Sequence, residues 1–437
     1  MLTFLFAILN LFLVACVKVQ LNPGLSLHEC KGKVWYRPNV LNRTDAQWNR
    51  FVEAVKMVHG DKEVLEKRIA IESVDYRKKY LELLRDNEDY SVYDQLVKIH
   101  IQHYDKYHNT SLFLPWHRAY VLLFERELLR VDPLVRLPYW DFTIHRALYN
   151  DPALSTERFG GSGLVNVALR PMGSFSNLLN YYHWDKDEYR YISRSNRFLA
   201  HRPISAVALM IDYILLDNYS EFTKHFEPSV HGEMHKAIGK EFFEHSSPND
   251  PLFFSFHSFV DKIFLIWQEK HGYSLDSIAD EQLEPFGIKV RDILNPKNKG
   301  CFTFKNLELV YNSKGDPLPE KLLSLLTKFT SRPKIAEMES PFEHFNISAR
   351  NLGLDLSKIQ ISNEEVEDRH NSMYDPDIIE ADIIRDNIVQ FISKLPLVQI
   401  EEIANGKLQE KDPNHSQPTS TPLAIALAFI FSLLHLI

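Results

Sequence analysis

The sequence predicts a mainly α-helical protein: a four-helix bundle with long loops and a C-terminal extension. Apolar residues recur at three- and four-residue spacing in several segments between residues 44 and 272, as in helices with one buried face. Residues 145–200 are rich in Gly, Asn, Tyr and Arg without such a period, which is typical of long loops. After about residue 305 charged residues increase and aromatic residues become rare. We therefore divide the chain into residues 1–19, 20–305, 306–412 and 413–437.

The first predicted helix begins at a recognisable cap. Thr44 and Gln47 form a capping-box pattern, apolar residues follow at helical spacing, and Gly60 is expected to end the helix. Three further helical patterns follow it: 62–86, Tyr93–His103 and Pro115–Arg130.

Two more helices are predicted after the loop region. A short helix is expected from Pro228 to about Gly239. Asp250 suits an N-cap and Pro251 suits the first helical position, so a longer helix is expected from there to Gly272.

Both ends of the chain are apolar, and they predict a secreted protein or one attached to the cell surface. Residues 1–19 are typical of a secretory signal, although Leu13–Cys16 also matches a bacterial lipoprotein cleavage box. The polar stretch Pro413–Thr421 precedes the uncharged run Pro422–Ile437, which is shorter than the ~20 residues of a membrane span. This order indicates a glycolipid-anchor signal, with a short membrane anchor as the alternative. Five Asn-x-Ser/Thr acceptors suit a glycoprotein of the eukaryotic secretory pathway: Asn42, Asn109, Asn218, Asn346 and Asn414.

Two cysteines, Cys30 and Cys301, remain if Cys16 leaves with the signal. In an oxidising compartment they either pair or stay as two buried thiols, and the sequence does not decide between these states. A bond between them would join the two ends of the main domain and contribute about 4–5 kcal/mol in the chain-entropy model. The formal net charge of −8 gives no electrostatic basis for a nucleic-acid partner.

Six of the 19 histidines stand out because they lie on or beside the strongest predicted helices. His231 and His235 are four residues apart, so both imidazoles lie on one helix face and can chelate one metal ion. His257, on the apolar face of the next helix, is the third candidate. A second group of three lies upstream: His100, His108 and His117. His103, one turn after His100, could replace it or line the same face.

The ligand type narrows the choice of metal. Sites built only from imidazole suit copper, zinc, iron or nickel. Zinc hydrolases of the His-Glu-x-x-His type need Glu directly after the first His, where this chain has Gly232. Two facing copper(I) ions, each held by three neutral nitrogens, can each give one electron to dioxygen. The histidines therefore favour a dinuclear copper centre inside the bundle.

Longer strings around these histidines resemble a known family. The string HNTSLFLPWHRAYVLLFE (108–125) resembles the first copper segment of tyrosinases, catechol oxidases and molluscan haemocyanins, and Tyr93–His100 resembles the segment that supplies their first ligand. Three strings resemble the second copper segment: HGEMH (231–235), SPNDPLFF (247–254) and HSFVD (257–261). Leu137–Asp141 also fits the family, and Cys301–Phe304 lies where a Gly-Tyr-x-Tyr motif usually closes the catalytic domain. The resemblance covers about residues 30–305.

The resemblance implies a catalytic centre with two copper ions and dioxygen as co-substrate. His100, His108 and His117 would bind the first copper ion, and a second triad would bind the other: His231, His235 and His257. It implies oxidation of monophenols, catechols or protein tyrosine to ortho-quinones, chemistry of the melanin or crosslinking type. Arg118 and Asp261 match structural positions of the family, and for Arg118 we expect a plain salt bridge.

Several positions depart from the family pattern. Phe256 replaces the first histidine of a His pair, and Lys106 stands where some members form a Cys–His thioether. Gly232 replaces an Asn that parts of the family use, together with a Glu, to activate a water for phenol deprotonation. The candidates for that Glu are Glu221 and Glu227, and we expect both to be surface carboxylates. The sequence thus supports catechol oxidation more firmly than monophenol hydroxylation.

Three other functions share parts of this pattern. An oxygen carrier would have the same site, usually in many copies per chain, and a protein that had lost copper would lack ligands. A zinc enzyme with altered metal is the third, which metal analysis distinguishes. Phe243, within 239–246, is a candidate gate to the site, although we expect it to pack in the core.

Overall fold

The computed structural model describes residues 21–71, 91–161, 173–195 and 201–309, apart from positions 32, 146, 184, 202, 205 and 306. The predicted signal, the later part of the 62–86 pattern, nearly all of the extension and the apolar tail lie outside the described residues. Within the described ranges, no helix is both long and apolar enough to cross a membrane.

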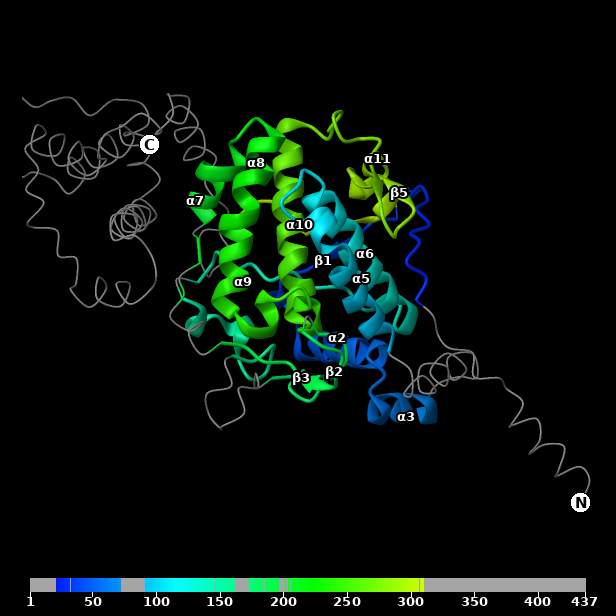
Figure 1. Cartoon of the computed structure of the whole chain (residues 1–437). Helices are drawn as coiled ribbons and strands as arrows, with labels where there is room; N and C mark the ends of the chain where they lie inside the picture. The colour runs from blue at the N-terminus through cyan, green and yellow to red at the C-terminus, as the bar shows by residue number, and fades with distance from the viewer. Residues whose placement is uncertain are drawn as a thin grey trace, which may run out of the picture. The chain divides into compact units, whose positions relative to one another are not determined.

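The protein is mainly helical and is built on a four-helix bundle, as predicted (Figure 1). The bundle helices are α5 (Val92–Tyr107), α6 (Phe113–Val131), the continuous pair α8 (Tyr219–Phe226) and α9 (Gly232–Ile238), and α10 (Leu252–His271). The other α-helices in the described ranges are α2 (Asp45–Val58), α3 (Lys62–Ile71), α7 (Ala206–Leu209) and α11 (Val290–Ile293). The strands are short: β1 (Trp35–Arg37), β2 (Leu179–Asn180), β3 (Arg190–Tyr191), β4 (Gln282–Leu283), β5 (Ile288–Lys289) and β6 (Phe302–Phe304).

Two compact units can be distinguished along the chain. One consists of residues 1–204 and 216–308, and it contains the whole bundle. The other consists of residues 205–215 and 309–437. Its described part is α7 followed by a π-helical turn, Met210–Ile214.

Aromatic packing between α6 and α10 forms the centre of the bundle. The rings of Phe124 and Phe254 stack with centroids 3.7 Å apart, and Tyr120 and Tyr93 pack against the same Phe254. All four side chains are almost completely buried. Because interiors are packed as densely as crystals, this core gives α6 and α10 a fixed relative position.

The predicted starts of the first helices agree closely with the structure. Thr44 caps α2 with the expected capping box, and Gly60 follows its end with a φ of 82°. Ser91 caps α5 with a second capping box, to Asp94, so this helix begins one residue before the predicted Tyr93 and continues to Tyr107. Helix α6 likewise exceeds the predicted Pro115–Arg130 by two residues at its start and one at its end.

The predicted helix from Pro228 was too short, because helical structure begins at Tyr219. The Asn218 side chain caps α8 by accepting from the amides of Ser220 and Glu221. The chain then passes through a π-helical turn, Glu227–His231, without interruption into α9. Pro228 does not start the helix; it lies at the first positions of this turn, where its missing N–H costs little.

The start of α10 differs from the prediction by one residue. The first helical residue is Leu252, and the Asp250 carboxylate accepts from its amide at 3.0 Å. The same carboxylate also forms a buried ion pair with Arg194. The helix ends at Gly272, as predicted, where the backbone turns with a φ of 93°.

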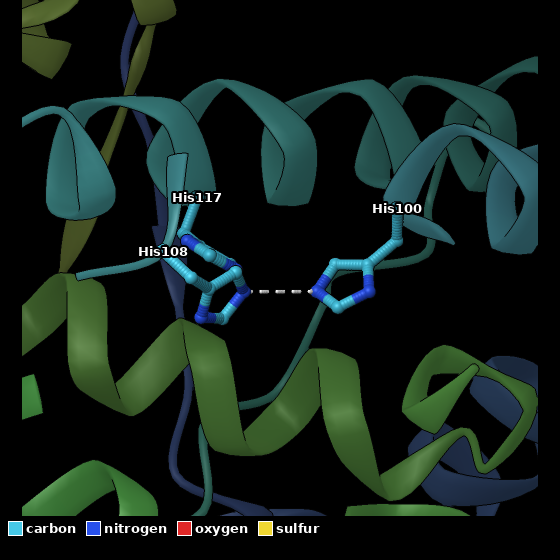
Figure 2. A group of neighbouring side chains, drawn as sticks. All are labelled: His100, His108 and His117. Atoms are coloured by element: carbon cyan, nitrogen blue, oxygen red, sulfur yellow. Dashed lines mark hydrogen bonds between the residues drawn. The ribbon is translucent and has the colours of Figure 1, made fainter. Parts of the chain in front are cut away.

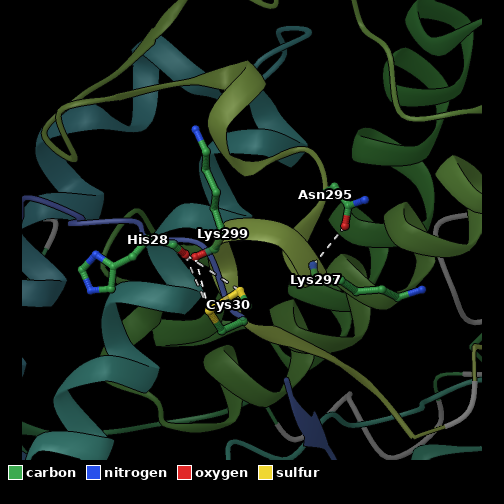
Figure 3. The surroundings of a disulfide bond; sticks show 6 residues. His28, Cys30, Asn295, Lys297 and Lys299 are labelled. Carbon is green, nitrogen blue, oxygen red and sulfur yellow. Dashed lines mark hydrogen bonds between the residues drawn. A yellow bond between two sulfur atoms is a disulfide. The ribbon is translucent and has the colours of Figure 1, made fainter. Parts of the chain in front are cut away.

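The ends of the main domain are joined twice. Strand β1 pairs in parallel with β6, with Trp35 opposite Phe302. Beside this pair, Cys30 and Cys301 form a disulfide bond between residues 271 positions apart (Figure 3). The structure thereby decides between the two states that the sequence left open.

The predicted loop region contains little regular structure in its described parts. Residues 145–161 form two 3-10 turns, and residues 173–195 form the two-residue strands β2 and β3, which pair antiparallel. The segment is nevertheless anchored, since Arg194 is buried and bonded to Asp250.

Candidate metal centre

Two adjacent helices supply the first group of histidines. His100 lies on α5, His108 is the C-cap of the same helix, and His117 lies on α6. The chain turns between the helices at Asn109, which has a φ of 58°. This short connection brings the three ligand nitrogens within 4.8 Å of one another (Figure 2).

The second group comes from the other two helical segments. His231 ends the π-helical turn, His235 lies one turn later on α9, and His257 lies on α10. Their ligand nitrogens also lie within 4.8 Å of one another. The groups face each other, since the rings of His117 and His257 stack with centroids 4.5 Å apart. All six predicted ligands are therefore together, and both predicted triads form.

Hydrogen bonds decide which nitrogen of each imidazole can bind a metal. The Nδ1 atoms of four histidines face backbone carbonyl oxygens, which can only accept hydrogen bonds: His100 to His245, His117 to Phe113, His231 to Glu227, and His235 to Phe242. The Nδ1 of His108 faces the carboxylate of Glu227 at 3.0 Å. Five rings thus carry the proton on Nδ1 and present a lone pair at Nε2.

The donor set fits metal ions. The Nε2 atoms of His100 and His108 face each other at 3.5 Å, although both are lone-pair acceptors that cannot donate to one another, and a shared cation satisfies both. The Nε2 atoms of His117 and His231 are buried without a hydrogen-bond partner among the described residues. Neutral imidazoles with Nδ1 fixed by a second group are the usual geometry of ligating histidines.

Burial keeps these imidazoles neutral. The six side chains are buried, and desolvation lowers the pKa of all six from the ordinary value of 6.5, for example to about 3 for His100 and about 4 for His235. A neutral imidazole is the form that binds a metal, so the site is prepared for a cation before it arrives.

Two phenylalanines line both triads. Phe113 lies 4.5 Å from His117 and 4.7 Å from His231, between ring centroids. Phe253 lies 4.0 Å from His257 and 5.1 Å from His100. These apolar side chains exclude water from the space between the ligands and strengthen electrostatic interactions there.

Glu227 is a buried part of the site, and the expectation that it is a surface carboxylate was wrong. Its carboxylate accepts from His108 Nδ1 and from the backbone amide of Asn109 at 2.8 and 2.9 Å. Burial raises its pKa to about 8, against the opposing effect of the Asn109 amide. Glu221, by contrast, is exposed and pairs with His225, as expected. The spacing of four residues between Glu227 and His231 was the available signal, since it places both on one helix face.

Neighbouring aromatic residues hold the ring of His108. Tyr104 stacks between the rings of His108 and His245, with centroid distances of 3.9 Å and 3.5 Å.

Lys106, at the position of the thioether cysteine in some relatives, points elsewhere and pairs with Glu284. His103 does not replace His100, because its Nδ1 faces the Ile99 carbonyl and it belongs to neither triad.

Arg118 and Asp261 pair with each other in the core. Arg118 Nε lies 2.5 Å from Asp261 Oδ1, and Arg37 bridges Asp261 and Glu125. The expected salt bridge of Arg118 is thus confirmed, and it joins α6 to α10. Through Arg37, the same cluster attaches strand β1 to both helices.

Two departures from the family pattern and the candidate gate, Phe243, remain to be placed in the fold. Phe256 is buried and stacks on His231 with ring centroids 5.7 Å apart. A Cβ at Gly232 would lie 3.2 Å from the Glu227 carbonyl oxygen, so the helix is close-packed there. Phe243 is 53% exposed, which contradicts the expected core packing; its neighbour Phe242 is the buried residue.

Part of the chain, including this centre, is similar to known proteins. Residues 90–270 match the model of the common central domain of tyrosinase. Grixazone synthase of Streptomyces griseus is 28% identical over 255 residues, which cover 46% of this chain and 82% of that protein. Tyrosinase of Streptomyces glaucescens is 31% identical over 180 residues, covering 38% of this chain and 65%, just under two thirds, of that protein.

Solved structures are similar at lower identity. A functional unit of octopus haemocyanin aligns with a TM-score of 0.44 and 20% identity over 66% of this chain and 72% of that one. A polyphenol oxidase from Thermothelomyces thermophila aligns with a TM-score of 0.45 and 16% identity. The alignment covers 63% of this chain and 89% of that one. The matched segment contains all six histidines of the two triads, so residues 90–270 are similar to the central domain of tyrosinase, and the two triads fit the pair of copper ions that this family of dioxygen-using proteins holds.

Proposed function

We propose that this protein oxidises phenols with dioxygen to ortho-quinones and that catechols are its substrates. The observation that carries the proposal is the pair of buried triads, in each of which the three ligand nitrogens lie within 4.8 Å of one another. A bound copper pair supplies dioxygen binding and two-electron oxidation, and the protein supplies positioning and exclusion of water. In the balanced reaction, two catechols and one O2 give two ortho-quinones and two waters.

The protein's own residues have separate tasks in this proposal. Four backbone carbonyls and Glu227 hold the Nδ1 protons of five ligands, so the Nε2 atoms of these five imidazoles stay directed at the metal site. His108 and His235 are 7% and 8% exposed, against 1–4% for the other ligands, so a phenol approaches from their side. Phe113 and Phe253 present apolar faces on which an aromatic substrate can pack.

Monophenol hydroxylation is the finer part of the proposal. A monophenol must lose its hydroxyl proton before it binds as phenolate. Glu227 is a buried carboxylate beside the first triad and four residues before His231, so it is our candidate to hold the water that takes this proton. Gly232 offers no side-chain amide to share that task.

Oxygen uptake by the copper-loaded chain tests the proposal. We expect uptake with a catechol and a slower uptake with the matching monophenol. Uptake with neither substrate, despite two bound copper ions that bind O2 reversibly, would instead establish an oxygen carrier like the haemocyanins. Two bound zinc ions in protein isolated from its source would point to the altered-metal alternative.

We also propose that the protein passes through the secretory pathway. The Cys30–Cys301 disulfide is the kind of bond that persists in an oxidising compartment. The three acceptors within the described residues, Asn42, Asn109 and Asn218, are all exposed. Expression in a eukaryotic cell should give a secreted or surface-held protein whose mass falls on treatment with an N-glycosidase. An unglycosylated protein recovered only from the cytosol with free thiols would contradict this.

A further inference from the structure

One short segment between α9 and α10 holds one ligand from each triad. We call residues 239–249 the bridging segment. The carbonyl of Phe242 accepts from His235 Nδ1 at 2.5 Å, and the carbonyl of His245 accepts from His100 Nδ1 at 2.6 Å. His235 belongs to the second triad and His100 to the first. A shift of this segment therefore moves the hydrogen-bond partner of a ligand in both triads.

A single carboxylate within the segment fixes its shape. Glu241 Oε1 accepts from the Ser246 hydroxyl at 2.6 Å and from Asn249 Nδ2 at 2.7 Å. Both carboxylate oxygens lie 3.1 Å from His183 Nδ1. The Glu241 side chain thus links the beginning of the bridging segment to its end through Ser246 and Asn249. It also attaches the segment to the loop that contains His183.

The partner of this carboxylate is a buried imidazole whose two ring nitrogens both face acceptors. His183 Nδ1 faces Glu241, and His183 Nε2 faces the carbonyl of Asn180 at 3.0 Å, so both ring nitrogens act as donors. The side chains of His183 and Glu241 are 1% and 10% exposed. A second bond, from Asn249 Nδ2 to the Tyr182 carbonyl at 2.7 Å, ties the same loop to the end of the segment.

We propose that Glu241, supported by His183, is a positioning residue for both copper ions. Because a carboxylate and an imidazolium hold the bridging segment in one conformation, the two carbonyls stay aligned with His235 and His100. Loss of the carboxylate charge releases the segment and weakens both metal sites together. This inference depends on copper binding and not on the proposed oxidase activity.

Copper retention by Glu241→Gln measures the effect directly. The substituted amide is nearly the same size, but its N–H₂ group cannot accept from His183. Outer hydrogen-bond partners of metal ligands typically contribute 10- to 100-fold to affinity, and Glu241 acts one step further out, so we expect about tenfold weaker retention of both ions. Copper per chain would be counted after dialysis against graded chelator concentrations. Glu244→Gln, an exposed carboxylate in the same segment, is the matched control and should behave as the unmodified chain.

A comparison of thermal stability with and without copper separates positioning from general support of the fold. Bound metal raises the midpoint by an amount set by its affinity. A positioning role reduces the difference between copper-loaded and copper-free Tm, whereas a merely structural role lowers both equally. Equal lowering, unchanged retention, or the loss of one ion only would each overturn the proposal. If Glu241→Gln does not fold, the Ser246→Ala variant, which removes one hydrogen bond to the same carboxylate, takes its place in both measurements. Failure of the unmodified chain to hold two copper ions would count against the copper centre itself.

Discussion

At the scale of single residues, the site depends on which ring nitrogen carries the proton. Five of the six ligand imidazoles have Nδ1 facing an acceptor, and four of those acceptors are main-chain carbonyls. Every residue has a main-chain carbonyl whatever its side chain, so no sequence motif predicts which carbonyls will act as these acceptors. The six ligands could be predicted from the sequence, because i, i+4 spacing and apolar faces are visible in it, but the orientation of their rings could not. Among the five acceptors, Glu227 is the one that uses a side chain, so it is the one that a sequence pattern could have indicated.

Glu227 is expected to matter most for the first triad. Replacing it with Gln places an amide N–H₂ near His108 Nδ1 and the Asn109 amide, which are both donors. We expect copper at the first triad to be retained about 10- to 100-fold less tightly, the range typical of such partners. Glu221→Gln, an exposed carboxylate six residues earlier, serves as the control. Equal copper content in the two variants over a chelator series would refute this role.

Gly232 is expected to set the balance between monophenols and catechols. Gly232→Asn introduces the amide that parts of the family use to hold a water with a glutamate, and general-base assistance of this kind contributes ~10²–10⁴-fold. Because the new Cβ meets the Glu227 carbonyl at 3.2 Å, the backbone must yield slightly, and only part of that gain is expected. We predict about a tenfold rise in the monophenol-to-catechol ratio of oxygen uptake. Gly232→Ala adds the same Cβ without the amide, and a similar rise in that variant would show that the amide is not the cause.

At the scale of elements, the bundle was predictable and the path of the chain between its helices was not. Caps such as Thr44 and apolar periodicity place the starts of α2, α5 and α6 within two residues, because those signals are local. The π-helical turn at Glu227–His231 has no local signature, and it hid the continuity of α8 with α9. It has a consequence for the site: the Glu227 carbonyl accepts both from the Gly232 amide and from His231 Nδ1. Such turns within α-helices often occur at functional sites.

The loop that contains His183 should respond to pH. Burial favours the neutral imidazole, but the hydrogen bond to Glu241 and its charge outweigh burial, so the pKa of His183 is raised above 6.5; Arg190 opposes this. A raised folded-state pKa contributes stability that is complete below 6.5 and is lost as pH rises through the folded value. We expect the copper-loaded chain to be about 1.5–3 kcal/mol more stable than His183→Gln below that pH, as for a buried hydrogen bond to a charged group.

Denaturant unfolding of both proteins over a pH series is the measurement. The difference between them should shrink as pH rises above 6.5, where the ligand imidazoles are neutral and titrate little. A difference that is constant or grows with pH would show that His183 is not the charged partner of Glu241.

At the scale of the whole molecule, the fold is closed by contacts between residues far apart in sequence. Arg37 on β1 reaches Glu125 on α6 and Asp261 on α10, and all three side chains are buried. No spacing rule predicts such a cluster, since its members are 88 and 224 positions apart. A buried charge without its partners is strongly destabilising, so the cluster holds β1 against the bundle only as a complete set.

The disulfide closes the domain at the same place, and its removal should lower stability without changing the metal site. Cys30 and Cys301 are 271 positions apart, and in the chain-entropy model a loop of that length contributes about 5 kcal/mol by restricting the unfolded chain. For a domain of this size each kcal/mol corresponds to roughly 2–4 °C, so the Cys30→Ser/Cys301→Ser variant should melt roughly 10–20 °C lower. The backbone bonds from Trp35 to Cys301 and from Cys30 to Asn298 remain in the variant and preserve the native arrangement. Its copper content per folded chain should therefore stay at two, and reduction of the unmodified chain should give the same Tm. A variant that loses copper as well as stability would show that the closure of the domain also shapes the centre.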